Sequence, residues 1–303
     1  RKIIIKKIQK KETSPEPAEV IENELEIVET VEEVKELFAL GIRAVNIYVK
    51  VNDDLKDNTG KEAWNQNGLM QLAIRAIKTA CPEMIVMPDV ALDPYSIYGH
   101  DGIIKNGDVA NDETNDALVK MAVSHAEAGA DFVAPSDMMD GRIAYIRDAL
   151  DSKGFTETSI MAYTAKYASG FYGPFRDALD SAPKAGDKKT YQMNPANKRE
   201  ALLEAELDYA EGADFMMVKP ASVYLDIIHE LKQNFPIPIA AYHVSGEYAM
   251  LKAAAQNGWL DYNKCLNETL LSIHRAGADV VITYGAKDFA STLYNQSLIY
   301  NMG

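Results

Sequence analysis

The sequence predicts an α/β protein of the (β/α)8, or TIM, barrel type in a single domain, and three observations support this fold class. A phrase recurs in which an amphipathic stretch ends at a glycine and an apolar run follows, as in "EAGADFVAPSD" from Glu127, "EGADFMMVKP" from Glu211 and "RAGADVVITY" from Arg275. Eight apolar runs of strand length can be counted, most of them separated by a helical pattern. The 303 residues, 47% of them hydrophobic, suffice for one large domain or two small ones.

The eight runs are expected to be strands that are buried on both faces, as in a parallel sheet. The first is the weakest, because Lys6 and Lys7 interrupt it. The stretches "DALVKMAVSHAEAG" and "REALLEAELDYAEG" are expected helices, since glycine just past a helix is a usual stop. A doubly wound sheet is the alternative, but no Gly-x-Gly-x-x-Gly follows any run. In chain order the expected strands are Ile3–Ile8, Ala44–Val49, Met84–Pro88, Asp131–Pro135, Thr158–Thr164, Asp214–Val218, Ile237–Tyr242 and Asp279–Thr283.

Residues 1–36 form an atypical N-terminal segment, and residues 37–303 the remainder of the catalytic barrel. Six of the first eleven residues are Lys or Arg, whereas most charges from Glu12 to Glu36 are acidic. The Pro-containing patch after the first run indicates a loop. The stretch "ELEIVETVEEVKELFALG" indicates strand-like residues that run into a helix.

Composition excludes several classes of partner. A formal net charge of −14 argues against nucleic acid, which needs a basic face. No apolar run approaches the ~20 residues that cross a bilayer, so no membrane partner is expected. The two cysteines, Cys81 and Cys265, are far apart, which fits a reducing compartment and offers no cysteine metal cluster. The expected location is the cytoplasm, or a plastid if a transit peptide was removed.

Two expected strands end in a lysine, Lys166 in "YTAK" and Lys219 in "MVKP". Barrel active sites lie at the C-terminal ends of the strands, where neighbouring backbones are ~5 Å apart. Each ammonium would disfavour the charged form of the other, and burial would add to this. A neutral lysine is a nucleophile toward carbonyls, so the pair suits Schiff-base chemistry. An ion-pair role is the alternative for a lone strand-end lysine. Other polar residues follow the same ends: Asp89, Asp93, Asp101, Ser136, Asp137, His243, Ser245 and Tyr284.

Several longer motifs occur in order from about Asn65 to Lys287. They are "DVALDPYSIYGHDG", "SHAEAGADFVAPSDMMDGR", "YTAKYASGFYGPFRDALDSAP", "GDKKTYQMNPAN", "VKPASVYLDII", "AYHVSGEYAM" and "RAGADVVITYGAK". In these motifs the chain resembles the 5-aminolevulinate dehydratase family, also called porphobilinogen synthase. The resemblance implies a (β/α)8 barrel that condenses two molecules of 5-aminolevulinate into porphobilinogen with loss of two waters, in tetrapyrrole biosynthesis.

The resemblance also implies a role for each lysine and for one carboxylate grip. Lys219 matches the lysine that forms the Schiff base with the first-bound substrate, and Lys166 matches the second lysine. Ser245 and Tyr284 match the pair that holds the carboxylate of the first substrate, and two neutral hydroxyl donors suit a carboxylate.

A second grip and a group near the second amine are implied in the same way. Arg176, Lys188 and Gln192 match the residues on the second carboxylate, with Arg176 in a segment that the family uses as a lid. Many members have arginine at the position of Lys188, and lysine lacks the planar fork of arginine. Asp89 and Ser136 match residues near the amine of the second substrate.

The metal expectation rests on three positions. Zinc-using members carry three cysteines where this chain has Ala91, Asp93 and Asp101, so no catalytic zinc is expected. Asp93 and Asp101 could bind a hydrated magnesium or potassium ion, or position the amine directly. His100 is more typical of a hydrogen-bonding residue than of a ligand. Glu204 matches the family's allosteric magnesium position between subunits, although an ordinary exposed glutamate is the alternative.

The resemblance implies a homo-octamer, in which a basic N-terminal arm wraps a neighbour. The sequence given starts almost at the first strand, so a magnesium-linked equilibrium with smaller species is expected. Either residues are missing from the N-terminal region or the segment has diverged. Two other classes stay open: another Schiff-base barrel lyase, such as a class I aldolase, and a non-catalytic relative. A class I aldolase generally needs one essential lysine, whereas this chain has two and two carboxylate grips.

Overall fold

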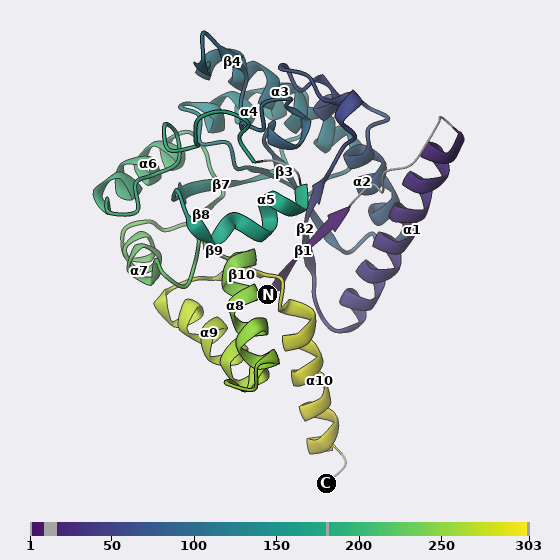
Figure 1. The fold of residues 1–303 in the computed structure, drawn as a ribbon, viewed down its shortest axis with the longest axis vertical. Coiled ribbons are helices and arrows are strands. Elements are labelled where there is room, and N and C mark those ends of the chain that lie inside the picture. Colours follow the sequence, from purple (N-terminus) through teal and green to yellow (C-terminus); the bar gives the residue numbers. More distant parts are fainter. Residues whose placement is uncertain (1, 9–16, 180–181, 302–303) are drawn as a thin grey trace.

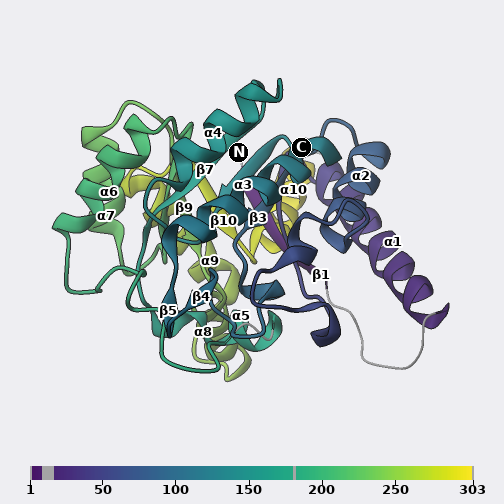
Figure 2. The same cartoon turned by 90° about the horizontal axis from the view of Figure 1, so that it is seen from above.

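A computed structural model describes residues 2–8, 17–179 and 182–301 of the chain. Eight parallel strands close into a barrel in the order β1-β10-β9-β8-β7-β6-β3-β2, and helices surround it (Figures 1 and 2). The predicted fold class is confirmed. The barrel strands are β1 Lys2–Ile8, β2 Ala44–Val49, β3 Ile85–Val90, β6 Phe132–Pro135, β7 Ser159–Lys166, β8 Phe215–Lys219, β9 Ile239–His243 and β10 Val280–Thr283.

All eight predicted strands are present, and their bounds agree with the predicted ones to within two residues. The weakest prediction, β1, pairs with β10 on one side and β2 on the other, and so closes the barrel. A short hairpin, β4 Ile104–Lys105 with β5 Asp108–Val109, was not predicted because each of its strands has only two residues.

Ten α-helices and four 3-10 turns occur in the described residues. Among these residues, none of the helices combines the length and the apolar character needed to cross a bilayer. The helices are α1 Pro17–Ala39, α2 Leu69–Ala80, α3 Asn111–Ala128, α4 Arg142–Ser152, α5 Gly173–Leu179, α6 Arg199–Ala210, α7 Leu225–Asn234, α8 Ser245–Gln256, α9 Tyr262–Ala276 and α10 Ala286–Asn301. The 3-10 turns are η1 Asp53–Leu55, η2 Lys61–Trp64, η3 Asp93–Tyr95 and η4 Gly170–Tyr172.

The N-terminal segment departs from its prediction. The stretch read as strand-like residues before a helix is helical throughout, as part of α1. Its buried side chains, Thr30, Val34 and Leu37, recur at helical spacing, and this period outweighs the local β-propensity of the isoleucine and valines. Pro17 opens the helix, where its missing N–H costs nothing. Residues 9–16, most of the predicted loop, lie outside the described residues.

The barrel interior and a short helix prepare one end of the barrel for a site. Large side chains fill the interior, among them Tyr163, Met217, Tyr242 and Ile282, so the barrel has a packed core rather than a pore. The short helix α5 lies over the end of the barrel where the strands finish, packed against the start of α8 (Figures 1 and 2). Polar side chains at the strand ends are therefore enclosed between the core and α5.

Candidate active site

The two strand-end lysines are neighbours, as predicted. Lys166 ends β7 and Lys219 ends β8, the two residues pair directly across the strands, and each is 5% exposed. An irregularity in β7 between Ala162 and Ala165 produces this alignment, because the register shifts by one residue there. Without the shift, Lys219 would lie opposite Ala165. The bulge therefore sets the two lysines directly opposite each other on neighbouring strands.

Aromatic rings surround the amine of Lys219. Its Nζ lies 4.5 Å from the centre of the Tyr242 ring and 5.2 Å from the centres of the Tyr163, Tyr172 and Phe175 rings. Two of these rings come from barrel strands, and Tyr172 and Phe175 come from η4 and α5 above the barrel. We call these four rings the aromatic cage. It keeps water away from the amine while leaving the ring faces to stabilise a cation.

The pKa of Lys219 is lowered to about 7. Burial is the largest cause and the positive charge of Lys166 the second, while Asp89 acts in the opposite direction. An ordinary lysine has a pKa near ~10.4, so at neutral pH the share of neutral amine is larger here by roughly a thousandfold. The predicted nucleophilic lysine thus has the electrostatic environment that this role requires.

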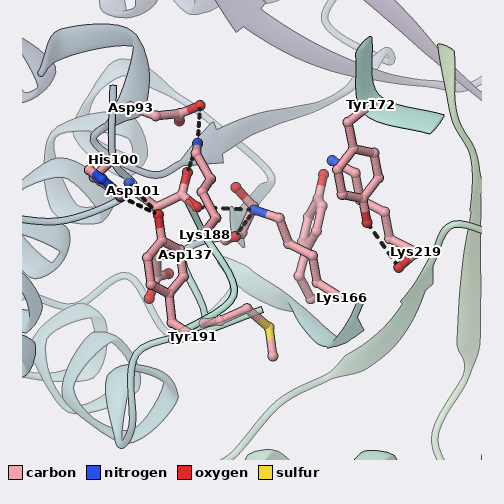
Figure 3. Close-up of polar contacts among 12 residues, drawn as sticks. Asp93, His100, Asp101, Asp137, Lys166, Tyr172, Lys188, Tyr191 and Lys219 are labelled. Carbon is pink, nitrogen blue, oxygen red and sulfur yellow. Dashed lines mark hydrogen bonds and ion pairs between the residues drawn. The ribbon is translucent and has the colours of Figure 1, made fainter. Parts of the chain in front are cut away.

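Lys166 points the other way, toward acidic groups (Figure 3). Its Nζ donates a hydrogen bond to the backbone carbonyl of Ser136, and it lies 3.6 Å from Asp101 Oδ2. The two lysines therefore end neighbouring strands but have different surroundings. Aromatic rings surround Lys219, and Lys166 is ion-paired.

Lys188 lies between two of the predicted metal-site aspartates (Figure 3). Its Nζ is 3.0 Å from Asp101 Oδ1 and 3.3 Å from Asp93 Oδ2, and all three side chains are buried. Burial alone would lower the pKa of Lys188, but the two carboxylates raise it above its ordinary value. Burial raises the pKa of Asp101 and the ammonium groups of Lys166 and Lys188 outweigh it, so that the pKa falls to about 2. A lysine ammonium thus occupies the centre of the aspartate pair.

His100 is a hydrogen-bonding residue, in line with the more typical of its two predicted roles. One ring nitrogen, Nδ1, lies 3.0 Å from the Tyr191 hydroxyl, and Nε2 lies 2.9 Å from the carbonyl oxygen of Ala185. Both nitrogens are thereby engaged in holding the segment around Lys188 against the loop after β3.

Two buried acceptors in the site have neither a hydrogen-bond partner nor an ion-pair partner within the described part of the chain. They are Asp89 Oδ1 and Gln192 Oε1. Burial, followed by the negative charge of Asp93, raises the pKa of Asp89 to about 7 against the pull of the lysines. An acid with this pKa can exchange a proton at neutral pH, and both acceptors are free for a ligand.

Nine of the twelve predicted site residues line one cavity, which we call the lysine cavity. Its volume is about 30 Å³, and Tyr48, Tyr172 and Phe175 line it as well. The guanidinium of Arg176 closes it from α5, 5.6 Å from the centre of the Tyr172 ring. The nine residues are Asp89, Asp93, Asp101, Ser136, Lys166, Arg176, Lys188, Gln192 and Lys219.

Ser245 and Tyr284 line an adjoining cavity of about 440 Å³, the hydroxyl cavity. Ser245 Oγ accepts a hydrogen bond from the backbone N–H of Phe175 at 3.1 Å, which ties α5 to α8. Tyr48 and Phe175 line both cavities. The predicted first carboxylate grip therefore adjoins the lysine cavity.

Glu204 lies apart from both cavities. It projects from α6 into a cavity of about 250 Å³ that Asp108, Asp140 and Glu200 also line. Its side chain is half-buried, and this burial raises its pKa to about 7. In the described residues, no three His, Cys, Asp or Glu side chains converge as a ready set of metal ligands.

The sequence did not reveal the aromatic cage or the groups behind Ser136. Tyr163 lies three residues before Lys166. In a regular strand, residues three apart point to opposite faces, so only the bulge puts both side chains on one face. Next to Ser136, Asp137 faces the buried Arg142, whose guanidinium is bonded to Asp208 at 2.7 Å. The sequence pattern that could have indicated this network is the charged motif "SDMMDGR".

The fold and the site define a class of protein: a (β/α)8 barrel with a buried pair of lysines, one of them enclosed by aromatic rings, at the C-terminal ends of its strands. The chain belongs to the delta-aminolevulinic acid dehydratase family. The sequence model described as Delta-aminolevulinic acid dehydratase matches residues 3–292.

Individual relatives agree with this assignment. The chloroplastic delta-aminolevulinic acid dehydratase of Physcomitrium patens is 57% identical over 264 residues, which are 87% of this chain and 61% of the relative. The enzyme of that name from Synechococcus elongatus is 54% identical over 274 residues, 89% of this chain and 83% of the relative. This chain spans about three fifths of the length of the plant relatives.

One solved structure superimposes closely. It is delta-aminolevulinic acid dehydratase (porphobilinogen synthase) from Toxoplasma gondii ME49 in complex with the reaction product porphobilinogen. The TM-score is 0.90 and the identity 48%, over 96% of this chain and 84% of the other.

Proposed function

We propose that this chain condenses two molecules of 5-aminolevulinate to porphobilinogen with loss of two waters, as a lyase of tetrapyrrole biosynthesis. Family membership and the product-bound relative support the proposal. The observation that carries it is the amine of Lys219, held in the aromatic cage with a pKa of about 7 beside a second lysine.

The first step uses Lys219 as the nucleophile. Its neutral amine adds to the ketone carbon of one substrate, and the resulting carbinolamine takes up a proton and loses water to leave a protonated imine. The positive nitrogen draws electrons from the neighbouring carbons, so that one of them gives up a proton more readily. The aromatic cage stabilises this cation through its ring faces.

Carboxylate grips at the two cavities hold the substrates. The hydroxyls of Ser245 and Tyr284 bind the carboxylate of the substrate on Lys219, in the hydroxyl cavity. Arg176, Lys188 and Gln192 bind the carboxylate of the second substrate in the lysine cavity. Lys188 can do so while it stays paired with the aspartates, because an ammonium has three donors.

The amine of the second substrate belongs near the acidic groups. Asp89 has a buried oxygen without a partner among the described residues, and Ser136 lies at the same cavity. A primary ammonium would satisfy this acceptor, and Asp89, with a pKa of about 7, could take up a proton from it. Lys166, at the same edge, is the second amine available for imine formation.

We propose further that Lys188 fills the place that zinc holds in other members. Its ammonium lies between Asp93 and Asp101 and neutralises them, which leaves little attraction for another cation. A magnesium or potassium ion at these aspartates would have to displace the ammonium. Magnesium fits better near Glu204, where a hydrated ion needs only one or two carboxylates.

Borohydride reduction in the presence of labelled 5-aminolevulinate, followed by peptide mapping, tests the function. The label should appear on the peptide that contains Lys219. Lys219→Ala should abolish trapping and turnover, whereas Lys166→Ala should lose turnover and keep some trapping at Lys219. Lys189→Ala, which changes an exposed lysine, is the control. Full trapping and activity in the Lys219 variant would show that the assignment is wrong.

Sedimentation velocity with and without magnesium tests a second part of the proposal, a homo-octamer that magnesium favours through Glu204. Glu204→Ala should remove the effect of magnesium on both size and activity, and Glu206→Ala, on the same helix but exposed, should not. A single species in every case would leave the link without support. A cytoplasmic or plastid location is also proposed, since the plant relatives are named chloroplastic and the cyanobacterial one is not.

A further inference from the structure

A cluster of three buried polar side chains connects β2 with β7 across the interior of the barrel. Asn46 Nδ2 donates to the Tyr48 hydroxyl at 2.9 Å and to the Tyr163 hydroxyl at 3.2 Å. The two hydroxyl oxygens are 2.7 Å apart. None of the three side chains is more than 2% exposed. Tyr163 is also a ring of the aromatic cage, so the cluster lies directly behind Lys219.

The hydrogen atoms of this cluster do not all find acceptors within it. Asn46 uses both amide hydrogens as a donor, and its own oxygen has no partner in the described part of the chain. The two phenols carry one hydroxyl hydrogen each, but a single hydrogen bond joins them. One O–H group is therefore left to donate elsewhere, and a buried donor without an acceptor costs roughly 1–3 kcal/mol.

The remaining donor belongs to Tyr48, because Tyr48 is the phenol of this pair that lines both cavities. Tyr163 then donates to the Tyr48 oxygen, and the Tyr48 hydrogen is left for a group outside this pair. Its ring meets the ring of Phe175 edge to face at 5.1 Å, which fixes it under α5. Burial raises the pKa of Tyr48 well above 10, so the hydroxyl stays protonated and keeps its hydrogen available for donation.

We propose that the Tyr48 hydroxyl donates a hydrogen bond to the ketone oxygen of the substrate that reacts with Lys219. The inference rests on the proposed function, because it assigns a further catalytic residue to the same site. As the amine adds, the C=O bond becomes a C–O single bond, and negative charge grows on an oxygen that Tyr48 can stabilise. That oxygen takes one proton from the attacking nitrogen and a second from a protonated acid of the site, for which Asp89 with its pKa of about 7 is suited; the C–O bond then breaks, water leaves and a protonated imine remains. Tyr48 keeps its own proton throughout.

The position of Tyr48 explains why this oxygen is the acceptor rather than the carboxylate. The carboxylate lies at the far end of the substrate, with Ser245 and Tyr284 in the hydroxyl cavity. The ketone carbon must bond to Lys219 in the lysine cavity. Tyr48 lines both cavities and so lies between these two points, which suits its hydroxyl to the ketone.

The test compares rates of trapping at Lys219 with cyanoborohydride for parent and Tyr48→Phe, using two ketones. One ketone is 5-aminolevulinate and the other is 1-aminobutan-2-one, which lacks the carboxylate. If Tyr48 serves the ketone oxygen, the variant should be slower by the same factor with both, and a factor of ten or more is expected for a lost donor to a developing oxyanion. Ser245→Ala should slow only the reaction of 5-aminolevulinate. Tyr145→Phe, on an exposed tyrosine, is the control.

Two results with Tyr48→Phe would overturn the inference. A Tyr48→Phe defect that appears only with 5-aminolevulinate would place the hydroxyl on the carboxylate and overturn the inference, as would an unchanged rate with both ketones. Absence of trapping in the parent chain would instead overturn the proposed function. If the variant does not fold, 3,5-difluorotyrosine at position 48 keeps the ring and the hydroxyl but makes it more acidic. Trapping should then weaken as pH rises through the pKa of the fluorinated phenol, and an unchanged pH profile would contradict the inference.

Discussion

Replacing Lys166 by methionine should raise the pKa of Lys219. Burial, the largest cause of the low pKa, remains in the variant, but the positive charge that is the second cause disappears. The two residues pair directly across β7 and β8, and a separation of roughly 6 Å between the two charges serves for an order-of-magnitude calculation. At that distance and an effective dielectric constant of about 20, one charge changes the ionisation free energy by about 3 kcal/mol, or about two pKa units.

The expected shift is somewhat smaller, because Asp101 already neutralises part of the charge of Lys166 at 3.6 Å. A rise of roughly one to two units would cut the neutral fraction of Lys219 at pH 7 from about half to about 1–10%. The opposite change is expected for Asp89→Asn. This substitution removes a negative charge that raises the pKa of Lys219, so the pKa should fall.

The assay is the rate at which an acylating reagent modifies Lys219, followed by mass spectrometry as a function of pH. It reports the neutral amine directly and does not depend on turnover. The parent should show a midpoint near 7, Lys166→Met a higher one and Asp89→Asn a lower one. Lys189→Met should match the parent. A parent midpoint near ~10, or shifts of the same sign in both variants, would refute the electrostatic reasoning.

Three other predictions follow. A zinc-selective chelator should leave turnover unchanged. Lys188→Met should create a site for Mn²⁺ between the two aspartates, and electron paramagnetic resonance should detect the bound ion. The parent should not bind Mn²⁺ there. Asp208→Ala should destabilise the fold by ~3–5 kcal/mol in denaturant unfolding, because it leaves the Arg142 guanidinium buried without that partner, and Arg142→Met with Asp208→Leu should recover most of the loss. Burial lowers the pKa of His125 to about 3, so between about pH 6.5 and 3 the unfolded chain binds a proton that the native state refuses. Stability should therefore fall by about 1.4 kcal/mol per pH unit as pH drops through that window, and His125→Gln should remove this slope.

The sequence predicts the barrel well because parallel strands covered by helices are apolar on both faces and stand out as runs. Glycine after each helix then marks where the next strand begins, as Gly129, Gly212 and Gly277 do in the structure. The prediction fails at α1, where the isoleucine and valines near its start suggested a strand. There the burial of a residue every three to four positions decides the structure. Local β-propensity does not include this burial, so it predicts the wrong element.

The candidate site is predictable only in part, for a geometric reason. Lysines at strand ends are visible in the sequence, because the end of an apolar run marks the depth of the residue in the barrel. Which side chains surround each amine depends on register, and one bulge in β7 changes it. The aromatic cage and the cluster behind it combine residues of β2, β7, η4, α5 and β9, from several parts of the chain, so no spacing in the sequence indicates them.

The different surroundings of the two lysines set the order of the proposed reaction. Lys219 faces four aromatic rings and has a neutral amine in quantity near pH 7, whereas Lys166 is ion-paired with Asp101. A ketone that reaches the site therefore meets its reactive amine at Lys219. Once a protonated imine forms there, a positive charge is fixed beside Lys166. The acidic groups around Lys166 then become the natural place for the ammonium of the second substrate, and the first condensation prepares the second.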